Sequence, residues 1–193
     1  MQQVKLLGWR HRYAGQPFTQ GYNKGVMRML LPTRPDTFAP RATVVCCAVL
    51  FQGELLLLKR AKGQWYEGLF GYPAGKPKPI DGGNLRATAV RELVEETGIA
   101  AFEFELREHG DGELYSRLTD ANGTADYIVH LFSYSVQRKP QAIKWDPANH
   151  ECYEWFPFSM VRARIDECID DVADCLDLIL SDPREHTVLA ITA

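Results

Sequence analysis

Three glutamates fall within five residues of the segment RELVEETGI, which spans residues 91–99. With about 3.6 residues per helical turn, Glu92, Glu95 and Glu96 project within an arc of roughly 100° and share one face. Their mutual repulsion destabilises a helix, and Arg91, four residues before Glu95, offsets only part of it. Two explanations follow: a solvated acidic face, or a site for a hard cation such as Mg²⁺, which prefers carboxylate oxygens.

The segment that carries these glutamates has helix signals at both ends. Asn84 is a suitable N-cap residue, and Gly98 is a suitable C-cap residue. Apolar residues recur at helical spacing on a face distinct from that of the glutamates: Ala87, Val90, Leu93 and Val94. The sequence therefore predicts a helix between Asn84 and Gly98 that packs on this apolar face.

Strand patterns and a long loop surround this helix. Residues 61–83 are rich in glycine and proline and predict a long loop of the kind that often carries function. Strand patterns occur at residues 42–51, 54–60, 99–108 and 126–136. The first two flank the turn pair Gln52-Gly53 and predict a β-hairpin, and Asn122-Gly123 introduces the last. Sheet and helix are therefore mixed.

The two ends of the chain differ from this central region. Residues 159–180 predict one long amphipathic helix, and we interpret its acidic stripe as a solvated face: Asp166, Asp170 and Asp174. Residues 1–40 are punctuated by glycines and prolines and predict an irregular arm with a short strand near residues 26–31. We expect one domain over residues 41–193 and an N-terminal arm that is not a second domain.

Charge is distributed unevenly along the chain. Residues 1–41 contain seven basic side chains and one acidic one, a net charge of +6 in a chain whose net charge is -3. Because the basic residues are spaced among aromatic residues and prolines, we favour an arm that packs on the acidic body or on a partner subunit over one that binds nucleic acid. A homodimer formed through the arm or the last helix is compatible with this pattern, although no specific motif indicates it.

Composition argues against several classes of protein. A content of 46% hydrophobic and 24% charged residues is that of a soluble globular protein and not of a disordered one. The five cysteines form no CxxC pair, which argues against a disulfide framework and a zinc site, and Cys46 and Cys47 lie in an apolar run that we expect to be buried. The first residues lack the apolar core of a signal peptide, and no apolar run is long enough to span a bilayer. We therefore expect a cytoplasmic protein without a membrane partner.

The predicted loop and helix together resemble the signature of the Nudix hydrolase family, whose second half runs Arg-Glu-aliphatic-any-Glu-Glu-any-Gly-aliphatic. That half is matched at every fixed position: Arg91, Glu92, Leu93, Glu95, Glu96, Gly98 and Ile99. The segments ELLLLKR and NHECYEWFPFSMV resemble strands before and after the signature, so the resemblance spans roughly residues 41–165. It implies an α/β fold, the Nudix α/β/α sandwich with a mixed β-sheet, to which this chain adds an N-terminal arm and a long C-terminal helix.

The first half of the family signature, a glycine followed by five residues and a glutamate, is matched less well. The family has a glutamate with seven residues between it and the arginine, and this chain has Gly83 at that position. Gly75 lies eight positions before Gly83, where the family has six. We interpret this as two inserted residues and one missing carboxylate. Asp81 is a candidate replacement, but loss of the carboxylate is the favoured interpretation.

The resemblance implies a divalent metal site and pyrophosphate chemistry. The implied ligands are Glu92, Glu95, Glu96 and the carbonyl of Gly75, and the implied metal is Mg²⁺, with Mn²⁺ as an alternative. Arg91 is implied to orient the glutamates. Such ions polarise phosphoryl oxygens and bring a bound water toward hydroxide.

The sequence leaves the general base and the substrate contacts open. The candidate bases are Glu92, Glu96, Glu151 and His150, and a surface loop position for His150 is equally compatible with the sequence. Arg60 and Lys76 are candidate contacts for phosphate, and Trp65 is a candidate for stacking on a base. Tyr115 and His150 are further candidates for binding the substrate.

These observations favour hydrolysis of the pyrophosphate bond in a nucleoside diphosphate linked to another group. The segment Pro73-Ala74-Gly75-Lys76 resembles the loop entrance of enzymes acting on ADP-ribose or sugar nucleotides, and Tyr115 falls where dinucleoside-polyphosphate hydrolases often have tyrosine. The alternative is a nucleotide-binding or regulatory module with weak catalysis, which Gly83 and the insertion motivate. The expected partner in either case is a small nucleotide.

Overall fold

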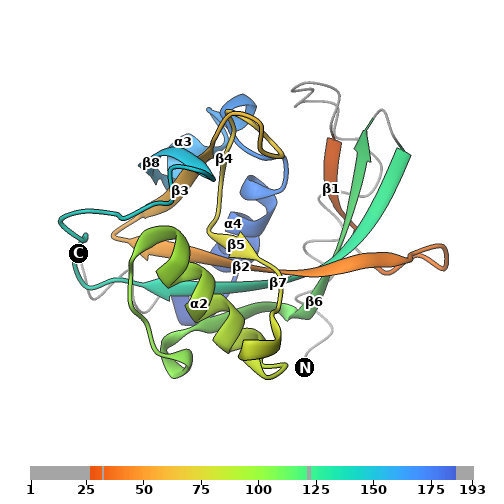
Figure 1. Cartoon of the computed structure of the whole chain (residues 1–193), viewed down its shortest axis with the longest axis horizontal. Helices are drawn as coiled ribbons and strands as arrows, with labels where there is room; N and C mark the ends of the chain where they lie inside the picture. The colour runs from red at the N-terminus through yellow and green to blue at the C-terminus, as the bar shows by residue number, and fades with distance from the viewer. Residues whose placement is uncertain (1–26, 32, 121–122, 186–193) are drawn as a thin grey trace.

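Figure 1 shows the computed structural model, which describes residues 27–31, 33–120 and 123–185. Within these residues, eight strands form one mixed sheet in the order β1-β6-β7-β2-β3-β4, with β5 paired to β2 and β8 paired to β3. The strands are β1 (Met27–Leu31), β2 (Pro40–Phe51), β3 (Glu54–Arg60), β4 (Phe70–Gly71), β5 (Ala74–Gly75), β6 (Arg107–Asp120), β7 (Gly123–Ser135) and β8 (His150–Pro157). The helices are α2 (Leu85–Thr97), α3 (Phe158–Val161) and α4 (Val172–Leu180), and short 3-10 turns cover Pro79–Asp81, Glu103–Glu105 and Ile165–Glu167.

Strand β2 runs through the middle of the sheet. It pairs antiparallel with β3 across a tight turn at Gln52 and Gly53, which confirms the predicted hairpin. Both turn residues have positive φ, 43° and 82°, as the twist of a tight hairpin favours. β2 also pairs parallel with β7 (Figure 1), and β5 pairs with β2 at Val45 and Cys46. The loop before α2 is thereby fixed on the middle of the sheet.

Alternate side chains of β2 build two separate cores. Val45, Cys47 and Val49 pack with Leu93 of α2 on one face of the sheet. Cys46 packs with residues of α4 on the other face. This period of two is that of a strand buried on both sides. Helices therefore cover both faces of a mixed sheet, which confirms the predicted α/β/α sandwich, and both cysteines are buried as expected.

Helix α2 begins and ends where its capping residues predict. The Asn84 side chain accepts hydrogen bonds from the backbone N–H groups of Arg86 and Ala87, at 3.0 and 3.4 Å. Gly98 ends the helix in the left-handed conformation, with φ of 70°, and its N–H donates to the carbonyl of Val94. Local sequence therefore sets both ends of the helix.

The buried face of α2 differs from the predicted apolar face. The helix buries Thr88, Ala89, Glu92, Leu93 and Thr97. Val94, expected in the core, is 46% exposed. The buried hydroxyls have partners, because Thr88 donates to Asp81 and Thr97 donates to the carbonyl of Leu93. Hydrogen bonds satisfy these polar groups away from water, so they can be buried. The spacing of apolar residues alone therefore predicted the wrong face of α2, and Glu92 lies on the face that is buried.

The prediction of one long C-terminal helix is wrong. Residues 159–180 contain the end of α3, a 3-10 turn and α4, with a non-helical link that includes Cys168 and Ile169. The N–H of Ile169 donates to the carbonyl of Phe70 at 2.9 Å, and Cys168 forms an isolated parallel bridge with the same residue. This tertiary contact replaces helical hydrogen bonds in the middle of the segment. Within the described part of the chain, no helix combines the length and apolar character needed to cross a membrane.

Asp170, which belongs to the acidic stripe predicted to be solvated, is engaged in a tertiary contact. Asp170 accepts a hydrogen bond from the backbone N–H of Arg28 at 2.7 Å, and the buried Asp171 beside it pairs with the Arg28 guanidinium at 2.9 Å. Arg28 lies on β1, which confirms the short strand predicted near residues 26–31. The predicted arm upstream of it, residues 1–26, lies outside the described residues.

The strand predicted at residues 99–108 is wrong over most of its length. The chain forms a 3-10 turn at Glu103–Glu105, and β6 begins only at Arg107. The Arg86 guanidinium donates to the carbonyls of Glu103 and Leu106, at 3.3 and 2.6 Å, and so takes the acceptors that a neighbouring strand would have used. The alternating Phe102 and Phe104 stack on each other and remain exposed.

Candidate active site

Two of the three glutamates of α2 lie against the short strand β5. The backbone N–H of Ala74 donates to Glu96 Oε2 at 2.9 Å. Glu92 packs directly on Gly75, since a Cβ atom built at that position would lie 2.0 Å from the carboxyl carbon of Glu92. A larger residue in place of Gly75 would therefore displace the carboxylate, which gives a physical reason for glycine at this point of the signature.

Glu96 is enclosed, with 12% of its side chain exposed. Burial, opposed by the hydrogen bond from Ala74 and reinforced by the charge of Glu92, raises the pKa of Glu96 to about 7. Two carboxylates that repel each other in a partly desolvated site are stabilised by a proton or by a cation. The pair therefore provides a place where positive charge is favoured.

Arg91 connects the glutamates to the loop before α2. Its Nε and Nη2 atoms donate to the two oxygens of Asp81 at 2.8 and 2.9 Å, and Nη2 also donates to the carbonyl of Lys76 at 2.9 Å. Its Nη1 atom donates to Glu92 and to Glu95, the latter at 3.0 Å. One guanidinium thus holds the loop and two of the three glutamates in a fixed relation.

Asp81 supplies the carboxylate that the sequence prediction regarded as missing. It is buried, and besides Arg91 it accepts hydrogen bonds from the Thr88 hydroxyl at 2.9 Å and from the N–H of Lys78 at 2.8 Å. The hydrogen bonds from Arg91 hold the pKa of Asp81 well below its ordinary value. The side chain is therefore a fixed, ionised anchor for the arginine.

The favoured interpretation of the signature is consequently wrong. Asp81 follows Gly75 after five residues, so the first half of the signature is complete with aspartate in the acidic position. The two extra residues are Gly82 and Gly83, which turn the chain into α2 with φ values of 60° and 79°. The family spacing, applied forward from Gly75, places the acidic residue at Asp81 and the insertion at Gly82 and Gly83. The same spacing applied backward from Arg91 places the acidic residue at Gly83, which is how the prediction went wrong.

Glu95 is the exposed member of the three, with 47% of its side chain accessible. Lys78 Nζ lies 2.9 Å from Glu95 Oε2, and this hydrogen bond, together with Arg91, lowers the pKa of Glu95. The sequence prediction missed Lys78. Seventeen residues separate it from Glu95, and only the fold of the loop brings the two together.

His150 lies beside Glu96 and not on a surface loop, because the residue is 1% exposed and begins β8. Its Nε2 atom is 3.0 Å from Arg60 Nη1 and 3.9 Å from Glu96 Oε1. A guanidinium can only donate, so Nε2 accepts and the ring proton sits on Nδ1. Burial and the charge of Arg60 lower the pKa of His150 to about 4. The structure therefore brings Arg60, His150 and Glu96 together.

The other predicted substrate contacts are less closely associated with the glutamates. The carbonyl of Lys76 contacts Arg91, whereas its side chain is exposed. Trp65 is 56% exposed, and its carbonyl accepts from Arg60 Nε at 3.3 Å. Tyr115 lies on β6, where its ring packs edge-on against Phe38. The structure thus places Lys76 and Trp65 at the edges of the site and Tyr115 in a separate part of the sheet.

The donor set is chemically suited to a hard divalent cation. Glu92, Glu95 and Glu96 offer only carboxylate oxygens, and the pKa of Glu96, raised by burial first and by the charge of Glu92 second, shows that a positive charge beside it is favoured. Among the described residues, no three acidic, histidine or cysteine side chains already converge as a metal site. Arg91 and Lys78 pair with two of the glutamates, so an ion bound here would share these carboxylates with the two cations or displace them.

Comparison with known proteins identifies the family to which the chain belongs. A model of the NUDIX domain matches residues 39–173 of the chain. Among solved structures, a NUDIX hydrolase from Nitrosomonas europaea has a TM-score of 0.57 and 23% sequence identity, over 74% of this chain and 90% of that chain. The NUDIX domain of Shewanella oneidensis NrtR, complexed with ADP ribose, has a TM-score of 0.52 and 18% identity, over 76% of this chain and 92% of that chain.

A third similar structure carries a metal ion. It is a bifunctional NMN adenylyltransferase/ADP ribose pyrophosphatase from Francisella tularensis, complexed with AMP and a Mn ion, with a TM-score of 0.53 and 18% identity over 75% of this chain and 42% of that chain. The search of curated proteins found no match. Sequence identities this low show a shared fold, whereas the family model spans most of the chain. The chain belongs to the NUDIX domain family.

Proposed function

We propose that this protein is a divalent-metal-dependent hydrolase that cleaves the pyrophosphate bond of a nucleoside diphosphate linked to a second group. The observation that carries the proposal is the packing of the glutamates of α2 against β5, with Glu92 on Gly75 and Glu96 on the N–H of Ala74. This packing directs two carboxylates to one place from rigid elements. Rigid placement is what phosphoryl transfer requires, since its catalysis is mostly positioning and electrostatic stabilisation.

Glu92, Glu95 and Glu96 are the residues that would hold the metal. When bound, Mg²⁺ or Mn²⁺ supplies Lewis acidity at the phosphoryl oxygens and lowers the pKa of a coordinated water. Arg91 keeps Glu92 and Glu95 on one side of the site through its anchor Asp81. Arg60, which is hydrogen-bonded to His150, would donate to a phosphate oxygen next to Glu96. Glu96 is the candidate general base that the pKa values favour, because its pKa of about 7 lets it accept a proton near neutrality, whereas a pKa of about 4 makes His150 a weak base there.

The similar structures support a nucleotide substrate. The NrtR domain was complexed with ADP ribose and the Francisella protein with AMP and Mn. An ADP-ribose or sugar-nucleotide type of substrate agrees with the loop entrance at β5. Tyr115, the sequence argument for a dinucleoside polyphosphate, packs on Phe38 in another part of the sheet, so this residue no longer supports that class, which the substrate panel below tests on equal terms.

One observation favours a second candidate, a nucleotide-binding module with little catalysis. Lys78 and Arg91 both bind Glu95, and Arg91 also binds Glu92, so two implied ligands are already paired with cations. If nucleotide binding does not release these pairs, the domain would recognise a diphosphate without hydrolysing it. A missing carboxylate in the family signature no longer supports this candidate, because Asp81 provides that carboxylate.

The experiment that separates the two candidates is a hydrolysis assay with Mg²⁺ on ADP-ribose, sugar nucleotides, dinucleoside polyphosphates and nucleoside triphosphates. The proposal predicts turnover of at least one class, lost in Glu96→Gln and in the Glu95→Gln/Glu96→Gln double variant. Wild-type turnover equal to that of the double variant on every substrate, with binding of one of them retained, would establish the binding module.

The division into an arm of residues 1–40 and a domain of residues 41–193 is proposed alongside this function, with one refinement. Strand β1 lies inside the proposed arm yet belongs to the sheet, and β2 already begins at Pro40. A test of arm function, including nucleic-acid binding or dimerisation, should therefore remove residues 1–26 and leave β1 in place.

A further inference from the structure

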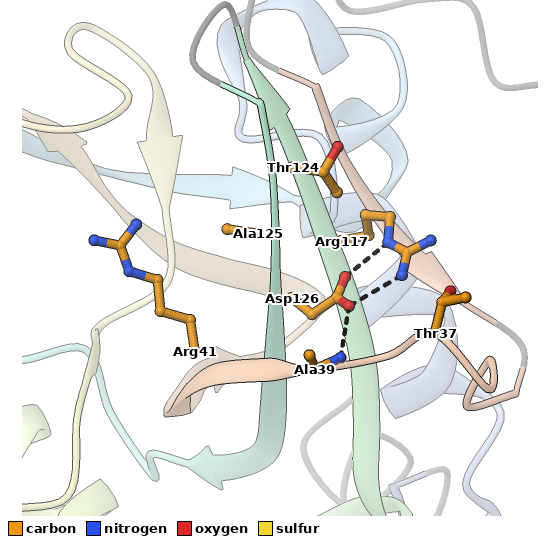
Figure 2. A pocket seen from close by; sticks show the side chains of 7 residues that line it. All are labelled: Thr37, Ala39, Arg41, Arg117, Thr124, Ala125 and Asp126. Carbon is orange, nitrogen blue, oxygen red and sulfur yellow. Dashed lines mark hydrogen bonds and ion pairs between the residues drawn. The ribbon is translucent and has the colours of Figure 1, made fainter.

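A polar pocket of about 510 Å³ lies at the end of the sheet away from the α2 C-terminus, between the start of β2 and the β6-β7 hairpin (Figure 2). Its lining includes Arg41, Arg117, Asp126 and Thr124. A volume of this size is typical of pockets that hold small molecules. We refer to it as the Arg41–Arg117 pocket, and none of its residues belongs to the glutamate cluster.

The carboxylate of Asp126 holds one wall of this pocket rigid. Asp126 is buried, and its oxygens accept from Arg117 Nε at 2.7 Å and Nη2 at 3.0 Å. Asp126 Oδ2 also accepts from the N–H of Ala39 at 3.0 Å, so both of its oxygens are used within the chain. Figure 2 shows this arrangement. Among the described residues, Arg117 Nη1 makes no hydrogen bond, which leaves a fixed donor for a ligand.

Arg41 supplies a second cation to the same pocket. A β-bulge between Pro40 and Ala42 takes Arg41 out of the regular register with β7. Bulges of this kind re-aim a side chain away from the alternation of the strand. The Arg41 side chain is exposed, and in the described part of the chain it has no hydrogen bond or ion pair. In Figure 2, Arg41 and Arg117 lie on opposite sides of Asp126.

The pocket opens on the same face of the sheet as the glutamates. Phe132 of β7 packs in the core under α2, and Asp126 lies six residues earlier, an even number that keeps it on the same face. Arg117 is the cross-strand partner of Asp126. Along β2, Arg41 precedes Val45 by four residues, about 13 Å of extended chain. Val45 pairs with Gly75, on which Glu92 packs.

We propose that the Arg41–Arg117 pocket binds an anionic group at the end of the substrate distant from the scissile diphosphate. This inference rests on the proposed function, because it takes the glutamate cluster as the place of the diphosphate. The ligand chemistry is a phosphate monoester or a carboxylate, both of which present paired oxygens to guanidinium groups. Preferred substrates then carry a negative group beyond the diphosphate itself.

Matched substrate pairs test this inference. ADP-ribose and its 2′-phosphate differ by one phosphate, and UDP-glucose and UDP-glucuronate differ by one carboxylate. We expect wild-type kcat/KM to favour the anionic member of at least one pair by about tenfold, which corresponds to about 1.4 kcal/mol. The pair that shows the preference identifies phosphate or carboxylate as the ligand.

Variants assign the preference to the pocket. Arg41→Gln should bring the ratio of kcat/KM between the anionic and the neutral member of each pair close to one. Arg117→Lys, which keeps a cation beside Asp126, should lower this ratio without abolishing the preference. Arg34→Gln is the matched control, because Arg34 is also exposed and lies near the pocket on Phe38 without lining it. A wild-type ratio near one for both pairs, or a ratio unchanged in Arg41→Gln, overturns the inference and leaves the hydrolase proposal intact.

Failure of the proposed function is recognised separately. If wild type hydrolyses none of the four compounds, their affinities are measured directly by calorimetry with wild type and Arg41→Gln. Tighter binding of the anionic member, lost in Arg41→Gln, supports the pocket in the absence of catalysis. Equal affinities within each pair overturn it.

Discussion

Arg91 and Asp81 form a two-point ion pair, with Nε–Oδ1 and Nη2–Oδ2 distances of 2.8 and 2.9 Å. Since the same guanidinium holds Glu92 and Glu95, Asp81 acts on the glutamates through Arg91. We predict that Asp81→Asn lowers kcat roughly 10–100-fold, as loss of an outer partner of a metal site commonly does. Steady-state kinetics at increasing Mg²⁺ measure this effect.

Asp81→Glu keeps the carboxylate and should retain most of the activity. Asp36→Asn is the control for a lost acidic residue, because Asp36 is exposed. Wild-type kcat in Asp81→Asn at every metal concentration would contradict the positioning role.

Gly75→Ala tests whether glycine is needed to seat Glu92. The added Cβ would lie 2.0 Å from the carboxyl carbon of Glu92, so we predict a folded protein whose kcat/KM falls at least about 100-fold, equivalent to about 2.7 kcal/mol. Gly63→Ala, in the loop between β3 and β4, is the control. Its Cβ meets nothing within 4 Å, although its φ of 81° makes the substitution strained. That control should lose about 1–2 kcal/mol of stability, because an L-residue is strained in the left-handed region, and it should keep its activity.

His109 should make stability depend on pH. The ring is buried beside Ser133, and burial lowers its pKa, with the charges of Glu185 and Asp182 opposing the shift. The folded state therefore binds a proton less readily than the unfolded state. Stability contributed by the neutral ring is complete above the ordinary pKa of 6.5 and is lost as pH falls below it.

Urea unfolding at pH 7.5 and pH 5.5 measures this dependence. His109→Gln should lose less stability than wild type between the two values, because glutamine has no proton to gain. An equal loss in both proteins would contradict a lowered histidine pKa.

Arg28 should stabilise the fold from within the N-terminal region. Its side chain pairs with the buried Asp171 and donates to the Ser116 hydroxyl, whereas its backbone N–H, which stays in an alanine variant, donates to Asp170. Removing one partner of a buried ion pair leaves an uncompensated charge, so we predict that Arg28→Ala lowers the free energy of unfolding by about 3–5 kcal/mol. Arg34→Ala, at an exposed position, should change it by less than about 0.5 kcal/mol. Chemical denaturation of the two variants distinguishes them.

The features of the fold that were predictable from sequence are those set by local interactions. Asn84 caps α2 through its own side chain, Gly98 ends the helix, and Gln52-Gly53 closes the hairpin. The break before α4 was not predictable, because its cause is a hydrogen bond between Ile169 and Phe70, far apart in the chain. Periodicity describes a segment by itself and carries no information about such a partner.

The candidate site shows the same division. The types and spacing of Glu92, Glu95 and Glu96 could be read from the helix alone. The buried side of the helix depends on hydrogen bonds of hydroxyl groups, such as the one that Thr88 donates to Asp81. Because the apolar pattern contains no such information, it did not predict that Glu92 is buried. The Lys78 contact with Glu95 depends on how the loop folds back over α2, which the sequence pattern does not specify.

Diffraction at the manganese absorption edge, from crystals containing Mn²⁺ and an ADP-ribose analogue with a non-hydrolysable methylene bridge, tests the central claim most directly. The account predicts anomalous peaks between the carboxylates of Glu92 and Glu96 and the bridging diphosphate, with Glu95 released from Lys78. Bound analogue without such a peak, and with Arg91 and Lys78 still paired to the glutamates, would contradict it.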